Sequence, residues 1–257
     1  MIIPKTTIKP TALSPQTLII YGNPKVGKTS ALISLPNCIT ISMEPGVEMH
    51  DMVYVKANDF AQFVDACDSI KRDGTYKFIA IDTVSRLEDF TNAEANRRYR
   101  RSNFGRNFEK DGGEDILTEL EHGAGYMHAR RVFNEALDKA ISSAPKTIFI
   151  AHSTDKVIKD QGAPDVTSAQ IDLIGKHKQI LCARGEIGHL VRKTRLRKTA
   201  DGRTVEDGML NFKTTEKLVC GARFNHLAGK EFTFLDGETL ATNWHLIYPD
   251  LFPAAAK

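Results

Sequence analysis

A glycine-rich octapeptide between a strand-like run and a helix-like run constrains this chain more than any other feature. It reads Gly22-Asn-Pro-Lys-Val-Gly-Lys-Thr29 and fits the spacing GxxxxGK[ST] in full. The apolar run Thr17–Tyr21 before it is typical of a buried parallel strand. The residues after it, 28–35, suit a short helix that Pro36 ends. A loop in this setting predicts an α/β fold with the octapeptide at the carboxyl end of the first strand.

This octapeptide is predicted to bind the phosphates of a nucleotide. Its glycines let backbone N–H groups turn inward around phosphate oxygens, and the helix behind them adds the positive end of its dipole. We expect Lys28 to reach the β- and γ-phosphates of ATP and the Thr29 hydroxyl to bind Mg²⁺. A chance match in an unrelated loop is the alternative. The full predicted set is Gly22, Asn23, Pro24, Lys25, Val26, Gly27, Lys28, Thr29 and Ser30.

A phosphate loop of this kind needs an acidic residue on a neighbouring strand to hold Mg²⁺ through water. Asp82 follows the apolar run Phe78–Ile81, at the carboxyl end of a predicted strand, where open α/β sheets bind their ligands. We therefore predict that Asp82 and Thr29 form the metal site. The alternative is an aspartate that only caps the next helix.

Two further polar residues follow predicted strands. Glu44 ends the strand-like run Cys38–Met43, and His152 follows the run Thr147–Ala151. Hydrolysis needs a group that orients or deprotonates water, which Glu44 could supply. His152 could touch the γ-phosphate and report its presence. The alternatives are a turn glutamate before Pro45 and a histidine that caps the end of a strand.

Strand-like and helix-like runs alternate over the first 151 residues. This order predicts a mostly parallel central sheet flanked by helices on both faces. The C-terminal third changes character, because residues 187–198 and 208–219 look like strands around the turn signal Asp201-Gly202. We expect antiparallel strands there, added to the same sheet. The whole chain, 1–257, is interpreted as one domain with an extended lead-in at 1–16, amphipathic helices at 58–72 and 126–141, a polar and basic insertion at 92–125, and C-terminal hairpin strands over 187–240.

Together, these strand ends resemble the RecA-like P-loop NTPase core. The match is closest to small phage-encoded RecA-like ATP-binding proteins of the AAA type that are implicated in single-strand annealing and recombination. It covers residues from about 17 to 155 and, more loosely, to about 240. It rests on the octapeptide, Met43-Glu44-Pro45-Gly46, Ile81-Asp82-Thr83 and Ala151-His152-Ser153.

The resemblance implies a Mg²⁺-dependent ATPase with Lys28, Glu44 and His152 in catalysis: Glu44 as the base and His152 as the γ-phosphate sensor. It also implies self-association into a ring or filament, with the nucleotide at subunit interfaces. A cation from a neighbouring copy often completes such sites. Arg223 is our first choice for it and Lys217 the second, and a surface charge beside a turn is the alternative. The sequence is shorter than bacterial RecA and shows no recognisable separate C-terminal domain, and this difference puts strand exchange in doubt more than ATP binding.

Two basic segments are candidates for binding single-stranded DNA. Cations can neutralise phosphates, and the neighbouring Phe104 and Phe108 could stack on unpaired bases. The alternatives are a solvated helix with internal ion pairs and an edge strand protected by its charges. The resemblance favours DNA. The first segment contributes Arg97, Arg98, Arg100, Arg101 and Arg106, and the second Arg192, Lys193, Arg195 and Arg197.

Composition narrows the remaining possibilities. The net charge of +3 is only weak support for a polyanionic partner. The four cysteines fit no zinc spacing. The N-terminus lacks the apolar stretch of a signal peptide, and no run approaches the length of a membrane span, so we expect no membrane contact and a cytoplasmic location. The alternatives to a recombination ATPase are a motor or loader in replication, and a nucleotide-gated assembly protein with little turnover.

Overall fold

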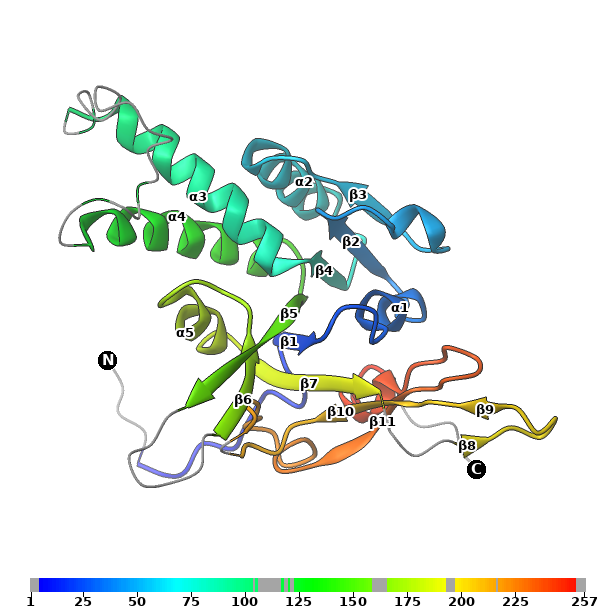
Figure 1. Cartoon of the computed structure of the whole chain (residues 1–257). Coiled ribbons are helices and arrows are strands. Elements are labelled where there is room, and N and C mark those ends of the chain that lie inside the picture. Colours follow the sequence, from blue (N-terminus) through cyan, green and yellow to red (C-terminus); the bar gives the residue numbers. More distant parts are fainter. Residues whose placement is uncertain are drawn as a thin grey trace.

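A computed structural model describes residues 5–103, 105, 117, 120, 123–158, 166–192, 197–215 and 217–252 (Figure 1). Within these residues, nine strands form the central sheet, in the order β11-β10-β7-β1-β5-β4-β2-β3, and β6 pairs with β5 off this path. The strands are β1 (Thr17–Gly22), β2 (Cys38–Ser42), β3 (Tyr54–Lys56), β4 (Phe78–Asp82), β5 (Lys146–Ile158), β6 (Val166–Ile171), β7 (Glu186–Arg192), β10 (Gly208–Asn211) and β11 (Glu231–Leu235).

The centre of the sheet is parallel and its C-terminal end is antiparallel. β1 pairs in parallel with both β5 and β7, and β4 joins β5 to β2 in the same sense. β10 then pairs antiparallel with β7 and β11. The predicted fold class is therefore confirmed. The parallel register places the ends of β1, β2, β4 and β5 on one edge of the sheet, which is where the functional side chains gather.

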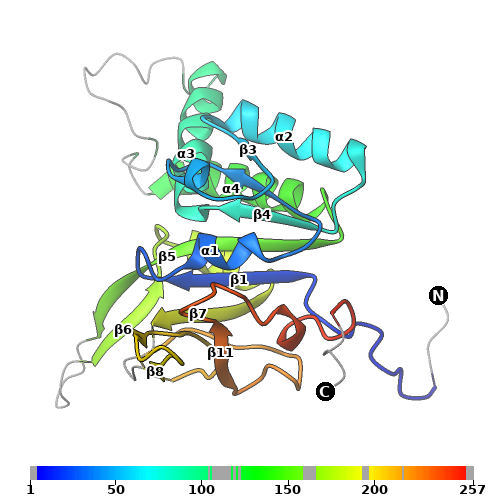
Figure 2. The same cartoon turned by 90° about the vertical axis from the view of Figure 1, so that its right-hand side faces the viewer.

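Helices cover both faces of the sheet. They are α1 (Lys28–Ile33), α2 (Phe60–Asp73), α3 (Val84–Arg101), α4 (Ala124–Ile141) and α5 (His177–Cys182). One apolar core joins the inward side chains of α2, α3, α4 and α5 to alternate residues of the strands, such as Ile79 and Ile81. The other core joins α1 and the C-terminal residues to the opposite face, through Phe78 and Ala80. Figure 2 shows α2, α3 and α4 grouped at one end of the molecule and β11 at the other.

The C-terminal residues pack directly on the helix that follows the phosphate loop. The indole N–H of Trp244, in the short 3₁₀ helix Trp244–Leu246, donates to the carbonyl of Ala31, with 3.0 Å between the two atoms. Trp244 is almost fully buried, stacks on Tyr248 and meets Phe234 edge to face. This contact ties the end of the described chain to α1 and thereby stabilises the loop in front of it.

The structure assigns part of one predicted segment to a helix and corrects another. The polar residues 92–101 of the predicted insertion continue α3, because Thr83 caps its start and a buried stripe with Leu87 and Ala95 faces the core. The strand predicted over 187–198 ends at Arg192, and residues 197–198 belong to a separate two-stranded sheet of β8 (Arg197–Lys198) and β9 (Thr204–Val205).

Other segments differ in length or were not predicted. The strand predicted over 208–219 ends at Asn211, whereas the strand predicted at 147–151 is the 13-residue β5. β3, β6 and α5 were not predicted. Residues 5–16, the described part of the predicted lead-in, contain neither helix nor strand. Among the described helices, none is both long and apolar enough to cross a bilayer.

Candidate nucleotide-binding site

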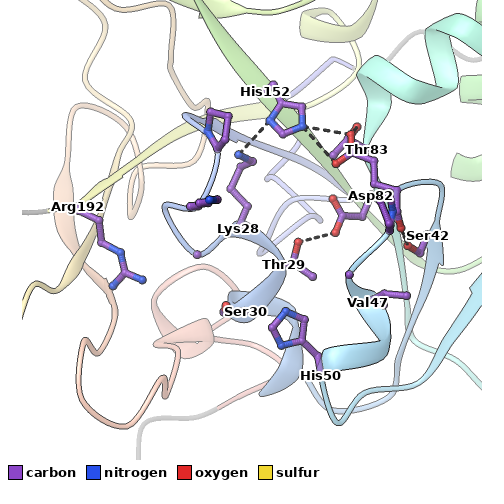
Figure 3. A pocket seen from close by; sticks show the side chains of 16 residues that line it. Lys28, Thr29, Ser30, Ser42, Val47, His50, Asp82, Thr83, His152 and Arg192 are labelled. Atoms are coloured by element: carbon purple, nitrogen blue, oxygen red, sulfur yellow. Dashed lines mark hydrogen bonds and ion pairs between the residues drawn. The ribbon is translucent and has the colours of Figure 1, made fainter.

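A cavity of about 410 Å³ opens at the carboxyl ends of the parallel strands. The predicted phosphate loop forms one wall, and the ends of β2 and β4 together with His152 from within β5 form the other (Figure 3). The fold therefore brings together residues that are as far apart in the chain as Pro24 and Arg192. The lining residues are Pro24, Lys25, Gly27, Lys28, Thr29, Ser30, Ser42, Glu44, Pro45, Gly46, Val47, His50, Asp82, Thr83, His152 and Arg192.

Two glycines shape the loop, for different reasons. A Cβ on Gly22 would lie 2.2 Å from the carbonyl oxygen of Leu190 in β7, so the backbones of β1 and β7 approach too closely for a side chain. Gly27 has a φ of 97°, a left-handed conformation that glycine adopts without strain. Its Cβ would also meet Leu235 at 2.6 Å. Gly22 is thus required by the packing of β1 against β7, and Gly27 by its backbone conformation.

Lys28 is held over the loop by the backbone of the loop itself. Its Nζ donates to the carbonyl oxygens of Gly22 and Asn23, at 2.7 and 2.8 Å, and only 5% of the residue is exposed. Burial lowers the pKa of Lys28 to about 8, although the nearby carboxylates of Asp82 and Glu44 act in the opposite direction. A buried ammonium group with this orientation is suited to meet an anionic phosphate.

Thr29 and Asp82 form a pair beside Lys28. The Thr29 hydroxyl donates to Oδ2 of Asp82, with 2.7 Å between the oxygens. Burial raises the pKa of Asp82, and the hydrogen bond from Thr29 works against this rise. A hydroxyl and a carboxylate are oxygen donors of the kind that Mg²⁺ prefers. No group of three or more His, Cys, Asp or Glu side chains in the described part of the chain could hold a metal alone, so a Mg²⁺ ion here needs phosphate and water as its other ligands.

Glu44 and His152 extend this arrangement on the far side of Lys28. His152 Nε2 lies 3.2 Å from Oε1 of Glu44, and its Nδ1 lies 3.5 Å from Nζ of Lys28. With Lys28 donating to Nδ1, the proton of the imidazole is on Nε2 and points at Glu44. The hydrogen bond from His152 is the main reason why the pKa of Glu44 is lowered, and a bond from Thr83 adds to it. Glu44 is therefore an oriented carboxylate that is charged at neutral pH.

Thr83 was not singled out in the sequence. Its hydroxyl donates to Oε1 of Glu44 at 2.6 Å, and it also caps the start of α3 by accepting from the N–H of Arg86. Its position directly after Asp82 was the available signal. Ser153 likewise follows His152 and donates to the side chain of Asn23 in the loop. His50 lines the cavity from an irregular segment after Glu44, where no periodicity pointed to it.

Arg192 lies in this cavity, although its sequence context suggested a DNA-binding patch. It ends β7, beside the phosphate loop, and its Nη1 donates to the carbonyl oxygen of Glu206 at 3.0 Å. Arg197, from the same predicted patch, forms ion pairs with Asp207 and Asp236. The other two members, Lys193 and Arg195, lie outside the described residues.

The first basic segment lies at the C-terminal end of α3. Arg97 and Arg98 both form ion pairs with Glu94, and Arg98 also pairs with Glu135 of α4. A surface hollow in the same region is lined by Ala93, Asn96, Arg97, Arg100 and Arg101. Arg106, Phe104 and Phe108 lie outside the described residues. The segment therefore combines internal ion pairs with an exposed cationic surface.

The two residues suggested as cations from a neighbouring copy lie away from the cavity of their own chain. Arg223 donates to Oε1 of Glu186 at 2.8 Å, and 74% of its side chain is exposed. Glu186 begins β7, so Arg223 lies at the amino end of the strands, opposite the phosphate loop. Lys217 is exposed, and its carbonyl accepts from the N–H of Ala169 in β6.

Comparison with known proteins adds a family to this geometry. None of the curated proteins matches the chain significantly. A family model described as an AAA domain matches residues 14–224, a range that runs from the residues before β1 to beyond β10 and contains the whole cavity wall. Since this match covers most of the chain, the protein belongs to the AAA domain family and carries an ATPase domain of the P-loop type.

Proposed function

We propose that this protein is a Mg²⁺-dependent ATPase that acts on single-stranded DNA in recombination or strand annealing of the phage type. The AAA domain supports nucleotide binding and hydrolysis in general. One observation supports the roles assigned to the residues: His152 contacts both Lys28 and Glu44. The hydrogen-bonded pair of Thr29 and Asp82 lies beside them. These contacts place a cation, an imidazole, a carboxylate and a metal-binding pair around one cavity.

Each residue has a role in the proposed reaction. Lys28 binds the β- and γ-phosphates and offsets the charge that develops during transfer. Thr29 and Asp82 hold Mg²⁺, which would neutralise charge on the phosphates. Glu44 accepts a proton from the attacking water, and His152 keeps its carboxylate in place. Because His152 contacts both Glu44 and Lys28, a γ-phosphate that draws on Lys28 also changes the contacts of the base.

The link to DNA is supported by α3, which connects the site to the basic segment. The helix starts at Thr83, whose hydroxyl binds Glu44, and ends 18 residues later at Arg101. At about 1.5 Å per residue, α3 is roughly 27 Å long. A movement of Thr83 at its start would therefore shift the basic residues at its other end. Arg100 and Arg101 line the hollow at its far end. Arginines on such a surface suit the phosphates of a nucleic acid strand.

ATP hydrolysis with and without a single-stranded oligonucleotide, at fixed salt, tests this coupling. We expect the oligonucleotide to raise the rate, and we expect the double variant Arg100→Ala, Arg101→Ala to lose most of that increase. The matched control is Lys71→Ala, Arg72→Ala, which removes two exposed charges from the last turn of α2. An equal increase in all three proteins would remove the basic end of α3 from the proposal.

An annealing assay separates the two main candidate functions. Complementary strands that anneal faster with the protein and ATP would support a recombination role. Stimulated hydrolysis without faster annealing would instead favour a replication motor or loader.

Self-association into a ring or filament is part of the proposal, with Arg223 and then Lys217 as the cations supplied by a neighbouring copy. Light scattering with and without ATP tests it, and a monomer under both conditions would contradict it.

A further inference from the structure

Arg192 lines the cavity as a cation to which the proposed reaction gives no role. It ends β7 and is only partly exposed, and in the part of the chain that the structure describes no carboxylate forms an ion pair with it. Its one hydrogen bond, to the carbonyl of Glu206, engages Nη1. Nη2 instead lies 3.2 Å from the position that a Cβ on Gly27 would take, so the guanidinium group lies against the phosphate loop.

The position of β7 in the sheet indicates which part of a nucleotide Arg192 meets. Asp82 ends β4, Glu44 follows β2 and His152 lies within β5. These three strands all lie on one side of β1 in the strand order. β7 is the neighbour of β1 on the other side. Figure 3 shows the same division, with Asp82 on one side of the loop and Arg192 on the other. A triphosphate with its γ-phosphate near His152 therefore has its α-phosphate and ribose on the flank of Arg192.

We propose that Arg192 binds the α-phosphate end of a nucleoside di- or triphosphate within its own chain, as a nucleotide-positioning residue. This inference rests on the proposed function of the cavity. A guanidinium group presents a rigid fork of donors that matches two oxygens of one phosphate. The bond to Glu206 holds Nη1, so Nε and Nη2 remain for the ligand. Arg192 thereby adds β7 to the elements that hold the nucleotide.

Calorimetric titration of the full chain with ADP and with ATP, both with Mg²⁺, tests the inference. Loss of a charge-assisted bond predicts a rise in Kd of about tenfold or more for both nucleotides in Arg192→Ala. Arg192→Lys keeps the charge but not the fork of donors, so its Kd lies between those of the wild type and Arg192→Ala. Arg203→Ala removes a more exposed cation of the β8–β9 turn that does not line the cavity, and it keeps the affinity and turnover of the wild type.

Kinetics separate this role from a catalytic one. Because an α-phosphate contact is made equally in the ground and transition states, Arg192→Ala raises KM and changes kcat much less. A fall in kcat with an unchanged KM, or an ADP affinity equal to that of the wild type, overturns the inference. Circular dichroism checks folding, and Arg192→Gln, which keeps the length and a donor, decides the question if the alanine variant does not fold.

The titration also separates this inference from the function on which it rests. A wild-type protein that binds neither nucleotide overturns both. A wild-type protein that binds and hydrolyses ATP, together with an Arg192→Ala variant of equal affinity, overturns only the role of Arg192.

Discussion

Lys28 is the residue on which the cavity depends most directly. Its ammonium group donates to two carbonyl oxygens of the loop and lies 3.5 Å from Nδ1 of His152. We predict that Lys28→Ala abolishes nucleotide binding, because the site loses its buried cation and the loop loses two hydrogen bonds. Fluorescence titration with a nucleotide analogue measures the loss. Tight ATP binding by a folded Lys28→Ala protein would overturn the assignment of the cavity.

At the residue scale, the sequence is informative where position in a motif implies position in space. Lys28, Thr29 and Asp82 are predictable because a loop and the end of a parallel strand have few possible arrangements. Arg192 was grouped with a predicted DNA-binding patch, because its basic neighbours suggested a strand with a cationic face, and the structure shows that β7 ends at Arg192 itself. Only the packing of β7 against β1 reveals that its end lies beside the phosphate loop.

At the element scale, the pairing of β7 with β1 makes stability depend on pH. The ring of His189 lies against Tyr21, with 4.7 Å between their centroids, and burial lowers the pKa of His189 to about 4 from an ordinary value of 6.5. Between pH 6.5 and 4, the unfolded chain therefore binds a proton that the folded chain does not. Stability falls as the pH falls through this window, by at most about 1.4 kcal/mol per pH unit from this residue.

Urea unfolding of the wild type and of His189→Asn at pH 7.5 and pH 4.5 measures this contribution. We predict that the wild type loses more stability than the variant between the two values, because the variant lacks the titrating ring. An equal loss in the two proteins would contradict the effect of burial on His189.

The elements that could be predicted were those with a clear period or a continuous apolar run. β1, β4 and α2 are of this kind, and their predicted limits are close to the observed ones. The C-terminal half of α3 could not be recognised, because only one of its faces is buried and most of its other residues are charged or polar. β3 has only three residues, at the edge of the sheet, and two of them are exposed, so it presents neither a period nor an apolar run that the sequence could reveal.

At the scale of the whole molecule, the sheet separates the cavity from Arg223. The phosphate loop and its partners lie at the carboxyl ends of the strands, and Arg223 lies at the amino ends. A neighbouring copy that placed its Arg223 at the cavity would therefore have to stack head to tail, which is the arrangement of rings and filaments. α3 and β7 connect the cavity to the rest of the chain through Thr83 and Arg192.

ATP binding and hydrolysis by the same preparation of Glu44→Gln test the central claim most directly. The substitution keeps the size of the side chain and its contacts with Thr83 and His152 but removes the charge that accepts a proton. We predict wild-type affinity for ATP and hydrolysis slowed by about a hundredfold or more, since a positioned general base contributes at least that much. Full turnover by Glu44→Gln would contradict the account and place the base elsewhere in the cavity.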